Sequence, residues 1–128
     1  MTEHMSRPIK FRAWDGQQMH YPEVVTIGVS GWNGKTSVSF QPSELGGGSI
    51  TTSMFMQWTG LHDKDGKEIY EGDIVAEFNG LKGTIVFKDC MFLVEWTRPN
   101  FMPMISCLSN IEVIGSVHQN PELLEEKP

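Results

Sequence analysis

Tight-turn signals divide this chain into short segments, and that spacing limits the folds it can adopt. Asparagine or aspartate precedes glycine at Asp15-Gly16, Asn33-Gly34, Asp65-Gly66 and Asn79-Gly80. Such pairs suit the turns that join twisted antiparallel strands, because glycine takes positive φ without steric cost. The segments between them are short, and many are rich in β-branched and aromatic residues, which favour strands. The pattern predicts a mainly β protein of small, strongly bent sheets.

Several segments have the composition or the two-residue alternation of a strand. They are residues 9–14, 24–29, 36–40, 50–59, 71–78, 83–87, 91–96 and 111–117. In the first of these, apolar residues alternate with Lys10 and Arg12, which follow Arg7. Three alternating cations are typical of the solvent face of a strand, and we expect these side chains to be exposed.

The chain is expected to contain an N-terminal β lobe at 1–57 and a second β region at 58–118. Residues 41–50 include a proline and three consecutive glycines, which predicts a flexible loop inside the first lobe. Residues 72–96 read as three strands joined by tight turns, a meander that resembles half of an SH3-like barrel. The remaining residues, 119–128, are expected to form a tail or a short helix.

Residues at the start of that tail favour a single helical turn. Asn120 suits the N-cap position, Pro121 the first helical position, and Glu122 the positive end of the helix dipole. A helix this short is stable only when it is docked against the rest of the protein.

The net charge of −6 is unevenly distributed. Residues 1–60 carry four cations and four anions, whereas residues 61–128 carry six cations and twelve anions. An acidic region repels the phosphate backbone, which argues against direct nucleic-acid binding there. No apolar segment is long enough to span a membrane, and the polar start of the chain does not resemble a signal peptide. We therefore expect a cytoplasmic protein that does not associate with membranes.

Cofactor and metal motifs are missing from the sequence. Cys90 and Cys107 form no metal-binding or redox pair, and both are expected to be small apolar core or strand residues. Asp63 and Asp65 lie close together, but the spacing of an EF-hand is not met. We expect no metal, no cofactor and no catalytic residue.

Residues 55–75, FMQWTGLHDKDGKEIYEGDIV, resemble the signature of the YopX family of small phage and prophage proteins. Residues 9–15 resemble the opening of that family, and residues 111–115 and 120–124 resemble its close. The resemblance implies a phage or prophage origin, a bacterial cytoplasm and a mostly β architecture. It implies no reaction.

Polar residues of the signature are expected to shape turns. Residues 63–67 read as a tight charged turn, in which aspartate side chains accept hydrogen bonds from backbone N–H groups. Asp73 is expected to cap a turn in the same way.

A set of aromatic residues is the candidate binding surface. It comprises Trp58, Tyr70, Phe87, Phe92 and Trp96. These rings would form either a groove that binds a peptide or a barrel core, and the core is the favoured interpretation. The candidate partner-binding residues are Trp58, Tyr70, Asp73 and Trp96.

These observations favour a non-enzymatic protein that binds other proteins or assembles with itself into a homo-oligomer. The alternative is an acidic phage factor that modulates a host DNA-binding protein, and a cryptic enzyme is the third hypothesis.

Overall fold

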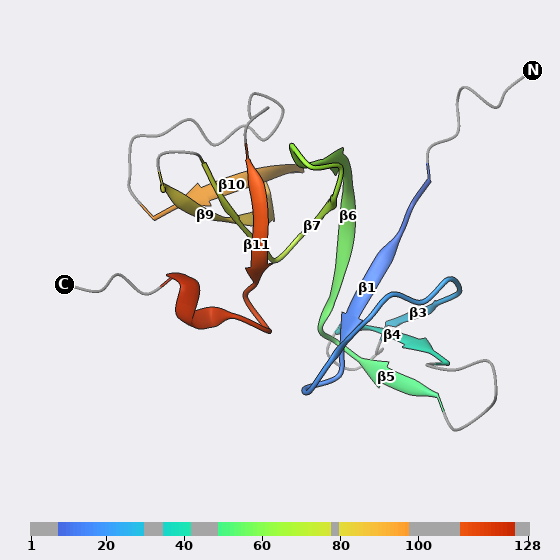
Figure 1. Cartoon of the computed structure of the whole chain (residues 1–128). Coiled ribbons are helices and arrows are strands. Elements are labelled where there is room, and N and C mark those ends of the chain that lie inside the picture. Colours follow the sequence, from blue (N-terminus) through green and yellow to red (C-terminus); the bar gives the residue numbers. More distant parts are fainter. Residues whose placement is uncertain (1–7, 30–34, 42–48, 78–79, 98–110, 125–128) are drawn as a thin grey trace, which may run out of the picture. The chain divides into compact units, whose positions relative to one another are not determined.

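The computed structural model describes residues 8–29, 35–41, 49–77, 80–97 and 111–124 (Figure 1). The chain divides into two compact units, Met1–Gln57 and Trp58–Pro128. Strands make up nearly all of the regular structure in the described residues, with one short 3₁₀ helix near the C-terminus. The predicted mainly β fold is therefore confirmed.

A hairpin opens the N-terminal unit. Strand β1 (Phe11–Trp14) pairs antiparallel with β2 (Met19–His20). The turn between them is the predicted one: Gly16 has φ +105°. Asp15 Oδ1 accepts the backbone N–H groups two and three residues further on, at 2.7 and 2.8 Å. A short acceptor side chain followed by glycine is what this turn requires.

Strand β1 is covered on both faces, contrary to the expected solvent face, although Lys10 just before it is exposed as predicted. Arg12 is 3% exposed and lies in register beside Met56 of β6 (Phe55–His62), which is 4% exposed. Ile9, expected on the apolar face, is 60% exposed. Alternation indicates a strand but not which faces are covered, and the long aliphatic stem of arginine can be buried. Arg7 lies outside the described residues.

A second sheet follows in the same unit. Its strands β3 (Thr26–Val29), β4 (Thr36–Phe40) and β5 (Ile50–Thr52) pair antiparallel in that order. The predicted hairpin between 24–29 and 36–40 is thus confirmed. Its Asn-Gly turn and most of the glycine-rich loop, residues 42–48, lie outside the described residues.

The segment 50–59, expected as one strand, is two. Thr52 ends β5, and its hydroxyl Oγ1 donates to Trp14 O at 2.9 Å. The same oxygen accepts the N–H of Met54 at 3.0 Å, so the chain bends before β6 begins. Threonine hydroxyls compete with strand pairing through such local bonds, which composition alone does not predict.

The two sheets of this unit share a small core. Ala13 and Val38 are fully buried, and Phe40 is 4% exposed. Partly buried apolar residues pack around them: Val25, Ile50 and Phe55. The core therefore joins β1 to the β3–β4–β5 sheet.

The C-terminal unit contains a four-stranded sheet. Its order is β10 (Met91–Trp96), β9 (Lys82–Lys88), β8 (Asp73–Ala76) and β11 (Glu112–Ser116). Strand β7 (Glu68–Tyr70) pairs with the end of β6. The predicted meander of three strands is confirmed as β8–β9–β10. The curled half-barrel sheet is consistent with an SH3-like barrel.

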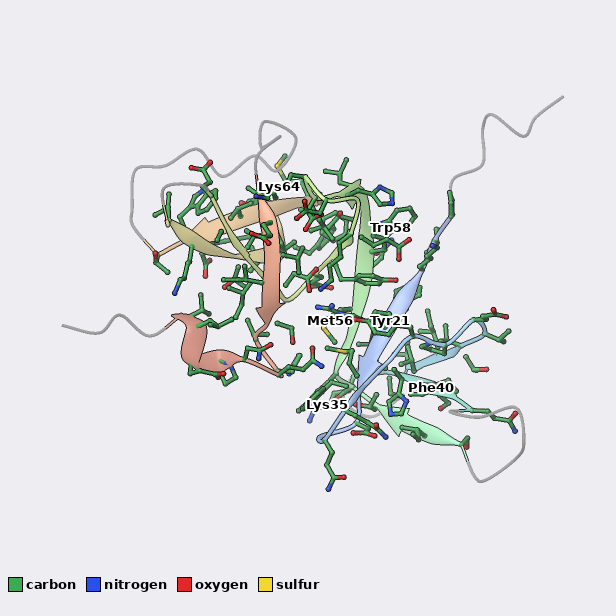
Figure 2. All side chains as sticks on the ribbon, viewed as in Figure 1. Tyr21, Lys35, Phe40, Met56, Trp58 and Lys64 are labelled. Atoms are coloured by element: carbon green, nitrogen blue, oxygen red, sulfur yellow. The ribbon has the colours of Figure 1, made fainter. Side chains whose placement is uncertain are left out.

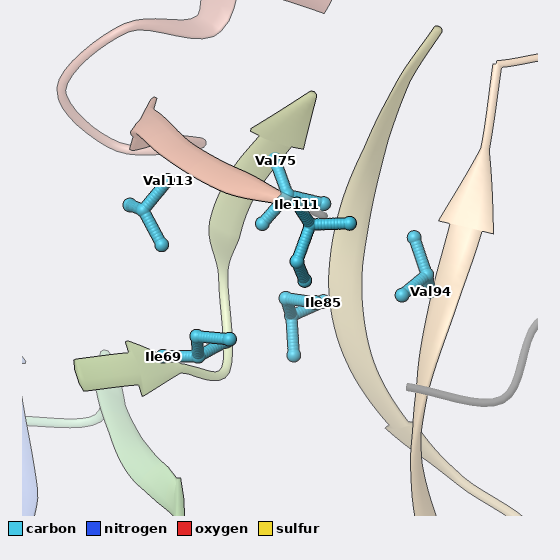
Figure 3. Packing of buried hydrophobic residues seen from close by; sticks show 6 residues of the cluster. All are labelled: Ile69, Val75, Ile85, Val94, Ile111 and Val113. Atoms are coloured by element: carbon cyan, nitrogen blue, oxygen red, sulfur yellow. The ribbon is translucent and has the colours of Figure 1, made fainter. Parts of the chain in front are cut away.

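Buried aliphatic residues from five segments meet inside this unit (Figure 3). They are Ile69, Val75, Ile85, Val94, Ile111 and Val113, all at most 8% exposed. Phe92 and Trp96 pack against them while remaining partly exposed. The cluster links β7, the meander and β11, which are far apart in the sequence.

Hydrogen bonds between residues 77 and 81 close the first hairpin of the meander. The N–H of Glu77 donates to Leu81 O at 2.9 Å, and Gly80 has φ +87°. Asn79 of the predicted Asn-Gly turn lies outside the described residues.

The second hairpin corrects the expectation for Cys90. Lys88 pairs with Met91, which leaves Asp89 and Cys90 as a two-residue turn. Their φ angles are +53° and +65°, the combination required by a type I′ turn. Cys90 is exposed rather than part of the core or a strand. Cys107 lies outside the described residues.

The predicted C-terminal helical turn is confirmed as a 3₁₀ helix, η3 (Pro121–Leu124). Asn120 precedes it and accepts the N–H of Leu123 through its backbone oxygen at 3.0 Å. Its side chain turns back and accepts the N–H of Ser116 at 3.3 Å. Lys82 Nζ donates to Leu123 O at 3.1 Å, which docks the helix onto β9.

Candidate interaction surfaces

Three of the four predicted partner-binding residues lie together around β6 and β7. Figure 2 shows Trp58 on β6. Trp58 is the register partner of Tyr70, and Asp73 Oδ2 accepts the N–H of Tyr70 at 2.7 Å. This last bond confirms that Asp73 caps a turn. Trp58 Nε1 donates to Leu61 O at 3.0 Å, and its ring meets that of His62 edge-on at 5.5 Å.

Trp96 belongs to a different pair of strands. It lies opposite Gly83, where a Cβ would come within 2.9 Å of Trp96 Cε3 and 2.6 Å of Val94 Cγ1. The missing side chain of Gly83 thus makes room for the ring against the core. Tyr70 and Asp73 are 4% and 2% exposed, so Trp58 and Trp96 are the members of the set that reach solvent. Their role in partner binding stays a prediction.

Asp63 organises the signature turn. Its Oδ1 accepts the N–H groups of Asp65 and Lys67, both at 2.9 Å, as the sequence predicted. Its Oδ2 accepts the N–H of Val113 at 2.9 Å, in a bond that spans 50 residues. Burial raises the pKa of Asp63, but the three N–H donors outweigh it and hold the pKa below the ordinary value of 3.8. This carboxylate ties the turn to β11.

Part of the acidic surplus is not surface charge. Asp63 and Asp73 are buried, at 8% and 2% exposed. Five acidic side chains of the C-terminal unit are exposed in the described residues: Asp65, Asp89, Glu95, Glu112 and Glu122. The surface is therefore less acidic than the residue count suggests.

A metal centre would need several ligating side chains in one place. Among the described residues, no three His, Cys, Asp or Glu side chains gather closely enough to hold a metal ion. The helical part of the described chain offers no segment that is both long and apolar enough to cross a membrane.

The β3 edge, Thr26–Val29, is the most open strand of the N-terminal unit. All four residues are exposed, with Ile27 at 49% and Val29 at 66%. Within the described residues β3 pairs only with β4, so its other edge is open. A strand without charge, proline or bulge presents a row of backbone donors and acceptors to an incoming strand.

The sequence predicted this strand but not the surface it forms. Residues 24–29 lack the alternation of polar and apolar residues expected of a half-buried strand. Such a run fits a strand covered on both faces or one that is open to a partner. The exposure of all four residues of β3, together with its position at the end of the sheet order, decides between the two.

A second apolar surface lies at the tip of the β9–β10 hairpin. The rings of Phe87 and Phe92 meet edge-on with centroids 5.0 Å apart, and Phe87 is 53% exposed. Met91, 49% exposed, and Cys90 lie beside them in the sequence. Isolated exposed apolar residues are common, but an aromatic pair at a hairpin tip is a candidate contact.

A comparison with known protein families identifies the family of this chain. The model of the YopX protein family matches residues 10–125. The chain belongs to the YopX protein family. This confirms the resemblance carried by residues 55–75 and by both flanks. Among curated proteins, none matches this chain.

Two solved structures resemble this YopX-family chain along nearly its whole length. The crystal structure of protein EF1440 from Enterococcus faecalis has 28% sequence identity and a TM-score of 0.59. It matches 94% of this chain and 100% of that chain. The structure of protein yopX from Bacillus subtilis has 24% identity and a TM-score of 0.54, with 91% and 98% covered. The second similarity concerns the fold alone.

Proposed function

We propose that this chain is a non-enzymatic protein–protein interaction module of a phage or prophage, and that it acts in the bacterial cytoplasm. The observation that carries the proposal is the open β3 edge, where Ile27 and Val29 are 49% and 66% exposed. Membership of the YopX family supports the phage or prophage context.

An open edge binds by strand addition. The backbone groups of the edge pair with those of an extended segment, and alternate side chains set the specificity. Ile27 and Val29 lie two residues apart, so they share one face of β3 and present two apolar side chains there. The β3–β4 register keeps this strand in place as a template.

Charges placed on the edge test the proposal. Ile27→Lys with Val29→Lys should abolish association, because edge lysines block strand pairing. Val24→Lys is the matched control, since Val24 is 78% exposed but precedes the strand. Light scattering of the purified protein and affinity capture from bacterial lysate are the two measurements. The proposal fails if wild type associates with nothing, or if the double variant associates as wild type does.

The predicted aromatic cluster is tested in the same experiments. Trp58→Phe keeps an aromatic ring but removes the Nε1 donor and part of the half-buried surface. If Trp58 contributes to partner binding, this variant should associate more weakly while its unfolding midpoint changes little. An unchanged association would remove Trp58 from the binding surface.

The exposed carboxylates of the C-terminal unit favour a second candidate, an acidic factor that engages a basic host DNA-binding protein. Asp65, Glu95 and Glu112 are exposed there. Binding to such a protein should weaken steeply as salt rises, because exposed charges are screened. Binding that does not change with salt, or that survives replacement of all three by their amides, would reject this candidate.

A further inference from the structure

We infer that the strand received by the β3 edge is β3 of a second copy of this chain, paired antiparallel about a twofold axis at Ile27. The inference rests on the proposed function and names its partner. The observations behind it are the exposure of β3, its sequence and the charge distribution.

The antiparallel geometry restricts the register. Backbone donors and acceptors alternate from one side of a strand to the other, so a twofold axis between identical strands must place a residue opposite itself. An axis at Ile27 places Val29 opposite Val25 and Thr26 opposite Gly28, so that residues 25–29 are paired throughout. β-branched residues then face one another across one side of the pair, which stabilises antiparallel strands.

The charges favour a second copy as the partner. Strand β3 has no charged residue, and residues 1–60 are neutral, whereas the whole surplus of −6 lies in residues 61–128. Two copies therefore meet with little repulsion if they meet through β3. The antiparallel arrangement also brings Glu23 of one copy to the end of the sheet where Lys35 of the other precedes β4. These charges are opposite.

The pairing closes on itself. Each copy uses its β3 edge once, so the product is a dimer with a continuous six-stranded sheet in the order β5–β4–β3–β3–β4–β5. No open β3 edge is left for a third copy. This outcome removes the edge that would otherwise favour aggregation.

Cysteine cross-linking tests the register in the full chain. In a background with Cys90→Ser and Cys107→Ser, oxidised Ile27→Cys should form a disulfide-linked dimer, because the two copies of residue 27 lie opposite each other. Thr26→Cys and Gly28→Cys are matched controls on the same strand, and both should remain monomeric on a denaturing gel. Ile27→Cys that cross-links no better than these controls overturns the pairing, and so does preferential cross-linking of Gly28→Cys.

Sedimentation velocity of the unmodified chain tests the partner. Wild type should sediment as a dimer, and Ile27→Lys should raise the dissociation constant by about tenfold or more. Circular dichroism checks that the variant is folded, and Val24→Lys should remain dimeric. A dimer that survives Ile27→Lys overturns the inference.

The same measurement separates this inference from the proposed function. A monomeric wild type that captures another protein only when Ile27 is intact refutes self-pairing and leaves the interaction module standing. A monomeric wild type that shows no association dependent on Ile27 refutes both.

Discussion

Replacing Asp63 by asparagine keeps the shape of the side chain and removes one acceptor. The carboxylate accepts the N–H groups of Val113, Asp65 and Lys67, each at 2.9 Å. Asparagine offers one oxygen, which can still serve the two turn donors. Its NH₂ group then faces the buried N–H of Val113, so two donors meet and neither is satisfied.

The expected cost follows from these bonds. A hydrogen bond to a charged acceptor contributes about 1.5–3 kcal/mol, and a buried donor left unsatisfied costs about 1–3 kcal/mol. The donors of Asp65 and Lys67 lie at an exposed turn, where water can replace a lost partner. We therefore expect Asp63→Asn to lower the free energy of unfolding by about 2 kcal/mol, and Asp63→Ala by about 3 kcal/mol.

Urea unfolding at neutral pH measures the free energies, and amide hydrogen exchange at Val113 reports the local bond. Asp65→Asn is the matched control: its carboxylate is exposed in the same turn, and surface substitutions usually change stability by less than about 0.5 kcal/mol. The reasoning is refuted if Asp63→Asn is as stable as wild type within that margin. It is equally refuted if Asp65→Asn costs as much.

The pH dependence provides an independent check. Burial raises the pKa of Asp63, yet the three N–H donors leave it lower in the folded protein than the ordinary 3.8. The folded state therefore binds this proton less readily than the unfolded state. The contribution of Asp63 to stability is complete above pH 3.8 and is lost as the pH falls through the lowered pKa. The stability gap between wild type and Asp63→Asn should narrow over that acidic range, and a constant gap would contradict the account.

Three further changes have defined outcomes. Cys90→Gly should raise the free energy of unfolding in urea by about 1 kcal/mol, since φ of +65° strains a non-glycine residue; a loss of stability would contradict this. Gly83→Ala should lower the free energy of unfolding by about 1–3 kcal/mol, because the new Cβ would lie 2.6 Å from Val94 Cγ1. Unchanged stability would contradict this and show that β10 shifts at little cost. The hydrogen bond from His20, with two backbone N–H bonds, lowers the pKa of Asp15 to about 2. Acid unfolding followed by circular dichroism should therefore show Asp15→Asn losing less stability than wild type as the pH falls from 3.8 to about 2, and equal losses would contradict the assignment.

The local sequence predicted the positions of turns more reliably than it predicted which residues are buried. Glycine at Asp15-Gly16 and at residues 63–67 has the backbone role that its neighbours indicate, because turn geometry depends on a few consecutive residues. Cys90 shows the limit. The sequence predicted a turn between strands 83–87 and 91–96, but it placed Cys90 in the core or a strand, and only the pairing of Lys88 with Met91 shows that Cys90 belongs to that turn.

Burial could not be predicted in the same way. Arg12 lies in a strand with period-two alternation, as the sequence indicates, but its face of the sheet is covered. Asp73 was identified as a turn cap, whereas its near-complete burial depends on how β8 sits between β9 and β11. Neighbouring residues indicate the strand or turn in which a side chain lies. Its burial depends on strands that come from elsewhere in the chain.

The sequence by itself determined the mainly β class, the turn positions, the neutral first half and the family, because each depends on neighbouring residues or on a contiguous motif. Tertiary structure decided that β3 lies at an edge and that Asp63 reaches Val113 across 50 residues. Strand order and long-range hydrogen bonds depend on which segments meet when the chain folds. An apolar run such as 24–29 fits a buried strand or an open edge equally well until its neighbours in the sheet are known.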